Sequence, residues 1–334
     1  MTEAALEENG PRVPLLQPVQ SLWFVLMLVA SAGVVVDRFH ALPERAAGGF
    51  AVAFATLIVA GLWARCGAPI WVAAGVTALY GGIGVALQNQ VMLRGAALIT
   101  AAVVAVFAVL ITAPASRFRR AVVEVAISGV VAVLGAFAAV AYHVDVNGSV
   151  FRYTVLGLAL LGAFAAVYRP GAGLHGLGRR GYALIGGLAV LLAFGVAYSL
   201  ALTHWGSHYV SDTVDGLRTW THDTLGASPH LLEVIVGVPS LCWGVFTRAR
   251  RRQGWWMCAF GVAFTGPAAT SLVDGSLTRV ALLGCLYSMV LGVLVGFVVV
   301  RVEQTFTGSR GRRARRSEEA AAHRPEPLRW APLR

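Results

Sequence analysis

The stretch AVVEVAISGVVAVLGAFAAVAY, residues 121–142, decides the class of this protein, and Glu124 is its only charged residue. As a helix with a rise of about 1.5 Å per residue, it is about 33 Å long. That length matches the ~30 Å hydrocarbon layer of a bilayer. A lone strand in lipid would leave its backbone groups without partners, so the stretch predicts a membrane-spanning helix.

Nine other stretches have the same character, which predicts an all-α, polytopic integral membrane protein with ten helices in one bundle and short loops. The ten expected spans are 21–37, 49–65, 69–88, 95–113, 121–142, 152–168, 181–203, 229–247, 254–273 and 277–300. The composition agrees, because 57% of the residues are hydrophobic and only 13% are charged, whereas soluble proteins are about a quarter charged. We expect a tail over 1–20, a transmembrane domain over 21–301 and a disordered tail over 302–334.

The arginines predict how the bundle is oriented. All 27 basic residues are arginine, and short cytoplasmic loops retain positive charge. With both termini inside, the expected cytoplasmic segments hold 21 arginines and the outer loops hold 6. We therefore expect cytoplasmic N and C termini and a location in the plasma (inner) membrane.

The C-terminal tail is rich in arginine, glutamate and proline. Its most basic run contains Arg312, Arg313, Arg315 and Arg316 and lies about ten residues past the last expected span. Each basic residue near an anionic leaflet contributes about 1 kcal/mol to membrane association. We therefore expect the run to bind anionic lipid headgroups, and we do not expect a nucleic-acid partner.

Proline and glycine mark special positions within the spans. Pro239 and Pro267 predict kinks in the eighth and ninth spans, where neighbouring helices can tolerate a break. Gly292 and Gly296 form a G-x-x-x-G pair that allows helices to approach closely. We interpret this pair as a packing surface within the chain, with a dimer contact as the alternative.

Polar residues collect on the expected outer side. They include His143, Asp145, His204, His208, Asp212, Asp215 and His222. At helical spacing, most of those in the loop 204–228 share one face, opposite Val210, Val214 and Leu217. The loop therefore predicts an amphipathic helix on the outer membrane surface. This outer-face cluster is the candidate binding site, and a solvated polar rim is the alternative.

His204, His208 and Asp212 recur every four residues, so one helix face presents two imidazoles and a carboxylate. Three such ligands with an open position suit Zn²⁺ or a similar divalent ion. This metal is the only cofactor that the sequence suggests. The four cysteines form no C-x-x-C pair and are expected to behave as small apolar residues.

The same passage resembles the last motif of the type 2 phosphatidic acid phosphatases, S-R-x₅-H-x₃-D. His208 and Asp212 match its histidine and aspartate, but Ala201 and Leu202 replace its serine and arginine. The resemblance covers about a dozen residues and lacks the phosphate-binding arginine, so it does not predict an active phosphatase.

Other chemistries are excluded or disfavoured. The sequence GAGLHG, residues 171–176, follows an expected membrane helix instead of a strand, so we expect no dinucleotide. The absence of lysine excludes a Schiff-base or P-loop lysine. Glu124 and Glu233 fall near the ends of their spans, so no ionisable residue is expected at mid-membrane, which disfavours ion-coupled transport.

Three functions stay open. A carrier or permease for a small or amphiphilic solute is favoured by the span count and the broken helices. A membrane scaffold or accessory component without catalysis is the second. The third is an outer-face enzyme, metal-dependent or not, that acts on a lipid or envelope precursor. We expect the carrier first and an enzyme last.

Overall fold

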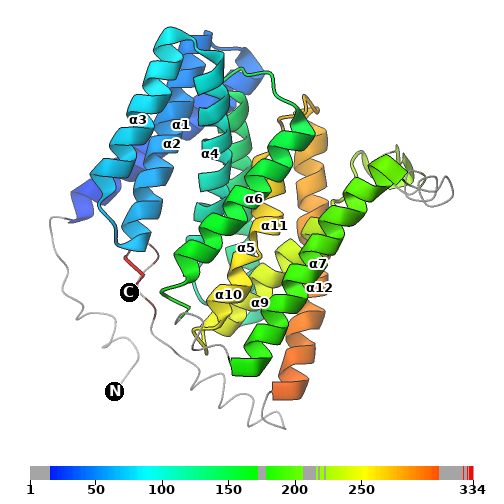
Figure 1. Cartoon of the computed structure of the whole chain (residues 1–334). Helices are drawn as coiled ribbons and strands as arrows, with labels where there is room; N and C mark the ends of the chain where they lie inside the picture. Colours follow the sequence, from blue (N-terminus) through cyan, green and yellow to red (C-terminus); the bar gives the residue numbers. More distant parts are fainter. Residues whose placement is uncertain are drawn as a thin grey trace.

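The computed structural model describes residues 16–171, 178–205, 216, 219–221, 223–307, 326, 329 and 331–333. In this part the protein is all-α, with eleven α-helices and one π-helical turn (Figure 1). The elements are α1 (Leu16–His40), α2 (Glu44–Cys66), α3 (Ile70–Leu87), α4 (Gln90–Leu110), α5 (Phe118–Val140), α6 (Gly148–Val167), α7 (Gly178–Trp205), η3 (Glu233–Gly237), α9 (Val238–Arg248), α10 (Gly254–Ala259), α11 (Val262–Ala269) and α12 (Thr278–Thr307).

Seven helices, α1–α6 and α12, are long and apolar enough to cross a membrane. Each has an apolar window with at most two charged residues, which is the composition that lipid requires. The long helices α1 and α3 bury only 17% of that window inside the protein. Their apolar side chains therefore face outward, as expected in a bilayer. The chain is a multi-span membrane protein.

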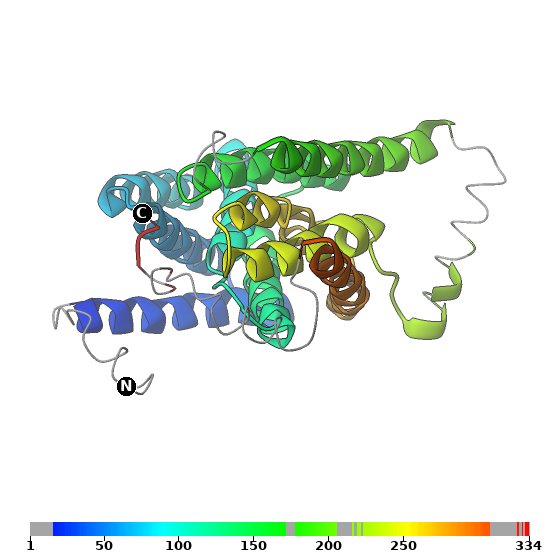
Figure 2. The same ribbon diagram turned by 90° about the horizontal axis from the view of Figure 1, so that it is seen from below.

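Short helices occupy the middle of the bundle. Seen from below, α9, α10 and α11 lie between α6 on one side and α5 and α12 on the other (Figure 2). Every residue from 254 to 266 is buried. The long helices therefore enclose a core made of short, interrupted segments.

The core segments depart from the sequence expectation. The expected span 229–247 forms a continuous helix over 231–248 that contains the π-helical turn η3 and ends as α9, and the expected span 254–273 is divided into α10 and α11. The helix α12 continues to Thr307, past the expected end of the membrane domain. It begins at the end of the bundle opposite the termini and ends near them (Figure 1). We call the end at which α1 begins and α12 ends the terminal end, and the other the opposite end.

Glycines allow the central elements to touch. A Cβ on Gly292 or Gly296 would come within 2.5 Å of Val238 or 3.0 Å of Cys242, so these glycines bring α12 against α9. The G-x-x-x-G pair is thus a packing surface within the chain, and this interpretation of the sequence is confirmed.

Candidate functional site

The first irregularity in the core is the π-helical turn η3, which ends two residues before Pro239. Proline lacks an amide hydrogen and its ring clashes with the carbonyl four residues earlier. Here the hydrogen-bond ladder shifts by one residue, because the Val238 amide donates to the carbonyl of Glu233, five residues back. Single π-helical turns occur frequently at functional sites. This turn places the side chain of Glu233 in the core.

The second interruption separates α10 from α11. At this break the Gly261 amide donates to the Cys258 carbonyl and the Phe264 amide donates to the Gly261 carbonyl, each three residues back. The two broken segments meet backbone to backbone. A Cβ on Gly237 would lie 2.2 Å from the amide nitrogen of Phe264, and one on Gly244 would lie 2.5 Å from that of Cys258.

The acidic side chain of η3, Glu233, is completely buried. Neither of its carboxylate oxygens makes a hydrogen bond. The hydroxyl of Ser288 on α12 is a polar neighbour of this carboxylate, and it accepts a 2.8 Å hydrogen bond from the His230 amide. The Ser288 hydroxyl proton is therefore available to donate to Glu233. Cys285, one turn earlier on α12, also interacts electrostatically with the carboxylate.

The depth of Glu233 follows from its neighbour Ser288. Ser288 lies ten residues into α12, about 15 Å along the helix from Thr278. That distance is close to half of the ~30 Å hydrocarbon layer. Counting along the sequence put Glu233 near the end of a span, and in the structure it lies two residues after Leu231, which is exposed at the start of this helix. The structure therefore places an ionisable group in the interior of the bundle, beside α12.

His143 lies after α5 at the opposite end, and its partner is a residue of α1. Its Nε2 lies 3.0 Å from Oδ2 of Asp37, which is 7% exposed. The other oxygen of Asp37 accepts a 3.1 Å hydrogen bond from the Leu42 amide. This arrangement ties the end of α1 to the end of α5, which is a structural role.

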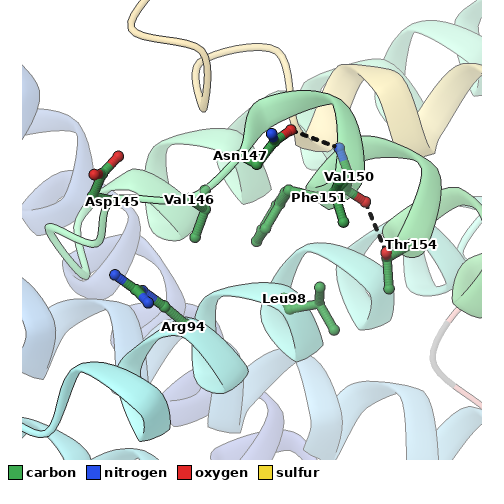
Figure 3. Close-up of a pocket in the computed structure, with 8 residues that line it drawn as sticks. All are labelled: Arg94, Leu98, Asp145, Val146, Asn147, Val150, Phe151 and Thr154. Atoms are coloured by element: carbon green, nitrogen blue, oxygen red, sulfur yellow. Dashed lines mark hydrogen bonds between the residues drawn. The ribbon is translucent and has the colours of Figure 1, made fainter.

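Asp145 lines an open hollow of about 520 Å³ between the start of α4 and the start of α6. Its carboxylate and the guanidinium of Arg94 lie at one end of the hollow, and Leu98 and Phe151 line the apolar part (Figure 3). Asn147 caps α6 by accepting a 3.2 Å hydrogen bond from the Val150 amide. The hollow therefore has charged side chains at one end and apolar side chains along its wall, an arrangement that suits a small amphiphilic molecule.

The rest of the expected outer-face cluster lies outside the described residues. His204 belongs to the last turn of α7, but its side chain is outside the description, as are His208, Asp212, Asp215 and His222. Within the described part of the chain, no three metal-binding side chains come together. The metal site and the amphipathic outer helix therefore stay predictions. The same holds for the lipid-binding run Arg312, Arg313, Arg315 and Arg316.

A group of buried and partly buried charged side chains lies at the terminal end. It comprises Arg65, Glu124, Arg248, Glu326 and Arg329, which we call the terminal-end cluster. Arg248 is fully buried and pairs with Glu326 at 2.8 Å, and Arg329 pairs with Glu124 at 2.7 Å. In one pair the bundle provides the arginine and the C-terminal segment the glutamate, and in the other pair these roles are exchanged. Part of the tail expected to be disordered is in contact with the helices.

Sequence reasoning missed both Glu233 and the terminal-end cluster. One signal for Glu233 was present, because a proline follows this acidic residue by six positions inside an apolar stretch. Nothing in the sequence links Arg248 to Glu326, which are 78 residues apart. Comparison with family models, curated proteins and solved structures finds no match to this chain.

Proposed function

We propose that this protein is a carrier or permease for a small or amphiphilic solute. In this proposal α7 and the two interrupted segments join the seven long helices to give ten crossings, with both termini cytoplasmic in the plasma membrane. The arginine distribution supports that orientation, because 21 of the 27 arginines would then lie inside. The proposal concerns the enclosed core and does not depend on the outer loop.

A single observation carries the proposal: a fully buried carboxylate, Glu233, lies at a π-helical turn inside the bundle, with the Ser288 hydroxyl as a polar neighbour. Carriers commonly bind substrate and coupling ions where membrane helices are discontinuous, because the freed backbone groups supply polarity there. A buried acid in a membrane is costly and usually takes part in ion or proton movement.

The native cysteines provide the experiment. Cys258 on α10 and Cys285 on α12 are buried, and Cys66 is half-buried at the end of α2. We would retain one cysteine at a time, replace the others by serine, and treat membrane vesicles with a membrane-impermeant cationic methanethiosulfonate. A carrier admits water to its core during the transport cycle, so Cys285 is expected to react in the native bilayer.

Leu79→Cys in the cysteine-free chain is the matched control, because Leu79 is 67% exposed but lies on the lipid-facing helix α3. It should not react with a charged reagent. If Cys258 and Cys285 are both fully protected in vesicles yet react after denaturation, the carrier proposal is wrong and a scaffold is favoured.

The role of Glu233 has a separate readout in the variant that retains only Cys285. An ionised carboxylate beside the thiol attracts a cationic reagent and repels an anionic one. Glu233→Gln should therefore lower the ratio of the cationic to the anionic reaction rate, by about tenfold for a charge a few ångströms away. An unchanged ratio would mean that Glu233 stays protonated or remote when the core is open.

The proposed orientation is tested by sidedness reporters fused after Arg120 and after Asp215. The two fusions should report opposite sides of the membrane, with Arg120 cytoplasmic. The same side for both would contradict the ten-span topology, without bearing on the role of the core.

A further inference from the structure

The guanidinium of Arg248 is held rigidly at the terminal end of the bundle. It stacks on the ring of Trp255 at 3.5 Å from the centroid. One terminal nitrogen donates to the hydroxyl of Thr112 at 2.8 Å, and the other donates to the Thr112 carbonyl at 2.9 Å. These bundle contacts fix the plane of the guanidinium before any anion binds.

The second terminal nitrogen of Arg248 also donates to an anion, the carboxylate of Glu326, at 2.8 Å. Glu326 belongs to the C-terminal segment, and eighteen residues separate it from the end of α12 at Thr307. Among the described residues, the bundle contributes one carboxylate to this cluster, Glu124. That carboxylate accepts hydrogen bonds from the Ala113 amide and from Arg329, so it is not paired with Arg248.

Arg65 is a second buried cation and is 2% exposed. Its guanidinium is repelled by Arg248 and attracted by Glu326. One terminal nitrogen donates to the Ala331 carbonyl at 2.7 Å, and the Arg65 carbonyl accepts from the Leu333 amide at 2.8 Å. The described part of the C-terminal segment is therefore fastened at several points. Without this segment, the described part of the cluster would contain two buried arginines, Arg65 and Arg248, and one glutamate, Glu124.

We propose that Arg248 and Arg65 form a binding site for a carboxylate or phosphate anion, which Glu326 occupies as a tethered ligand. Buried guanidiniums are strongly disfavoured without an anion, and a planar guanidinium fixed by stacking suits oxyanions. A tethered ligand acts at an effective concentration in the millimolar range. Free anions at such concentrations therefore compete with Glu326 and release the C-terminal segment.

The test measures phosphate binding to the full-length protein in phosphatidylcholine nanodiscs by titration calorimetry. Glu326→Gln removes the internal competitor, so it should bind inorganic phosphate at least about tenfold more tightly than the unmodified chain. Glu44→Gln is the matched control, because Glu44 is exposed at the opposite end of α2. It should bind phosphate like the unmodified chain.

Equal affinity in the unmodified chain and in Glu326→Gln, or no phosphate binding in either, would overturn the proposal. A second variant tests the arginine. Arg248→Lys in the Glu326→Gln background keeps the charge but removes the planar fork, and should lose the gained affinity. If that double variant still binds phosphate as tightly, Arg248 is not the anion ligand and the assignment fails.

The source of the anion is distinguished by hydrogen exchange in the C-terminal peptide that contains Leu333. If a soluble anion is the ligand, phosphate should speed exchange in phosphatidylcholine nanodiscs. If a lipid headgroup is the ligand, phosphatidylglycerol nanodiscs should speed it without phosphate. Equal release by chloride at the same ionic strength would indicate simple screening and refute the site. None of these measurements depends on transport.

Discussion

Gly237→Ala tests the contact on which the interrupted core depends. The added Cβ would lie 2.2 Å from the amide nitrogen and 2.6 Å from the Cβ of Phe264. Ordinary contacts are at least 3.4 Å, so η3 and α11 must separate by about 1 Å, and the obstructing atoms are largely backbone that cannot rotate away. Overpacking costs about 1–3 kcal/mol when side chains can adjust. We expect about 3 kcal/mol here.

The assay is thermal unfolding of the detergent-solubilised protein, followed by size-exclusion chromatography after heating. At about 2 °C per kcal/mol for a chain of this size, the midpoint should fall by about 6 °C. Gly82→Ala on α3 is the matched control, because no atom lies within 4 Å of its added Cβ. Alanine favours helix over glycine, so the control should be unchanged or slightly more stable. A Gly237→Ala midpoint equal to the control would refute the backbone contact between η3 and α11.

Three further substitutions probe other contacts by the same unfolding assay. Asp37→Ala should lower stability by about 1–3 kcal/mol, because it leaves His143 and a backbone amide without their acceptor; a neutral effect would mean that solvent replaces the carboxylate. Thr265→Val should cost about 1 kcal/mol, since it removes a buried 2.9 Å hydrogen bond to the Ala105 carbonyl at nearly constant volume. Gly292→Val should cost at least about 2 kcal/mol by pushing α12 away from α9, and unaltered stability would argue against that packing.

The long helices could be predicted because lipid imposes one strong constraint on them. The stretch 121–142 was expected as a span and forms α5, Phe118–Val140. Similarly, 95–113 was expected and α4 runs over Gln90–Leu110. Apolar length alone predicts such elements, since a bilayer accepts few alternatives. The boundaries differ by a few residues because loops and caps, such as Asn89 at the start of α4, are not part of the apolar signal.

The interrupted core could not be predicted from hydropathy. Pro239 and Pro267 indicated kinks, but the break between α10 and α11 falls at Phe260–Gly261. The mean hydropathy of an apolar stretch does not reveal that its glycines will pack against the backbone of another segment, as Gly237 packs against Phe264. It also does not reveal which residues a span will contact, so the burial of Glu233 beside Ser288 was not predicted. Depth in a bundle depends on tertiary packing.

The site residues divide in the same way. His143 and Asp145 were expected together as part of one outer-face cluster. In the structure His143 pairs with Asp37, and Asp145 lines a hollow together with Arg94. The pairing of His143 with Asp37 joins residues 106 positions apart, and no local pattern encodes it. The terminal-end cluster was hidden because low apolar content predicted a disordered tail.

The close backbone contacts at Gly237, Gly244 and Gly254 have a consequence for how this sequence can vary. At each of these glycines an added Cβ would come within 2.5 Å of a backbone atom, which cannot rotate away. Selection should therefore act on volume at these three positions more strongly than on charge elsewhere in the core. Distant relatives should then retain small residues at the positions of Gly237, Gly244 and Gly254, even where the acidic and basic residues of the core differ.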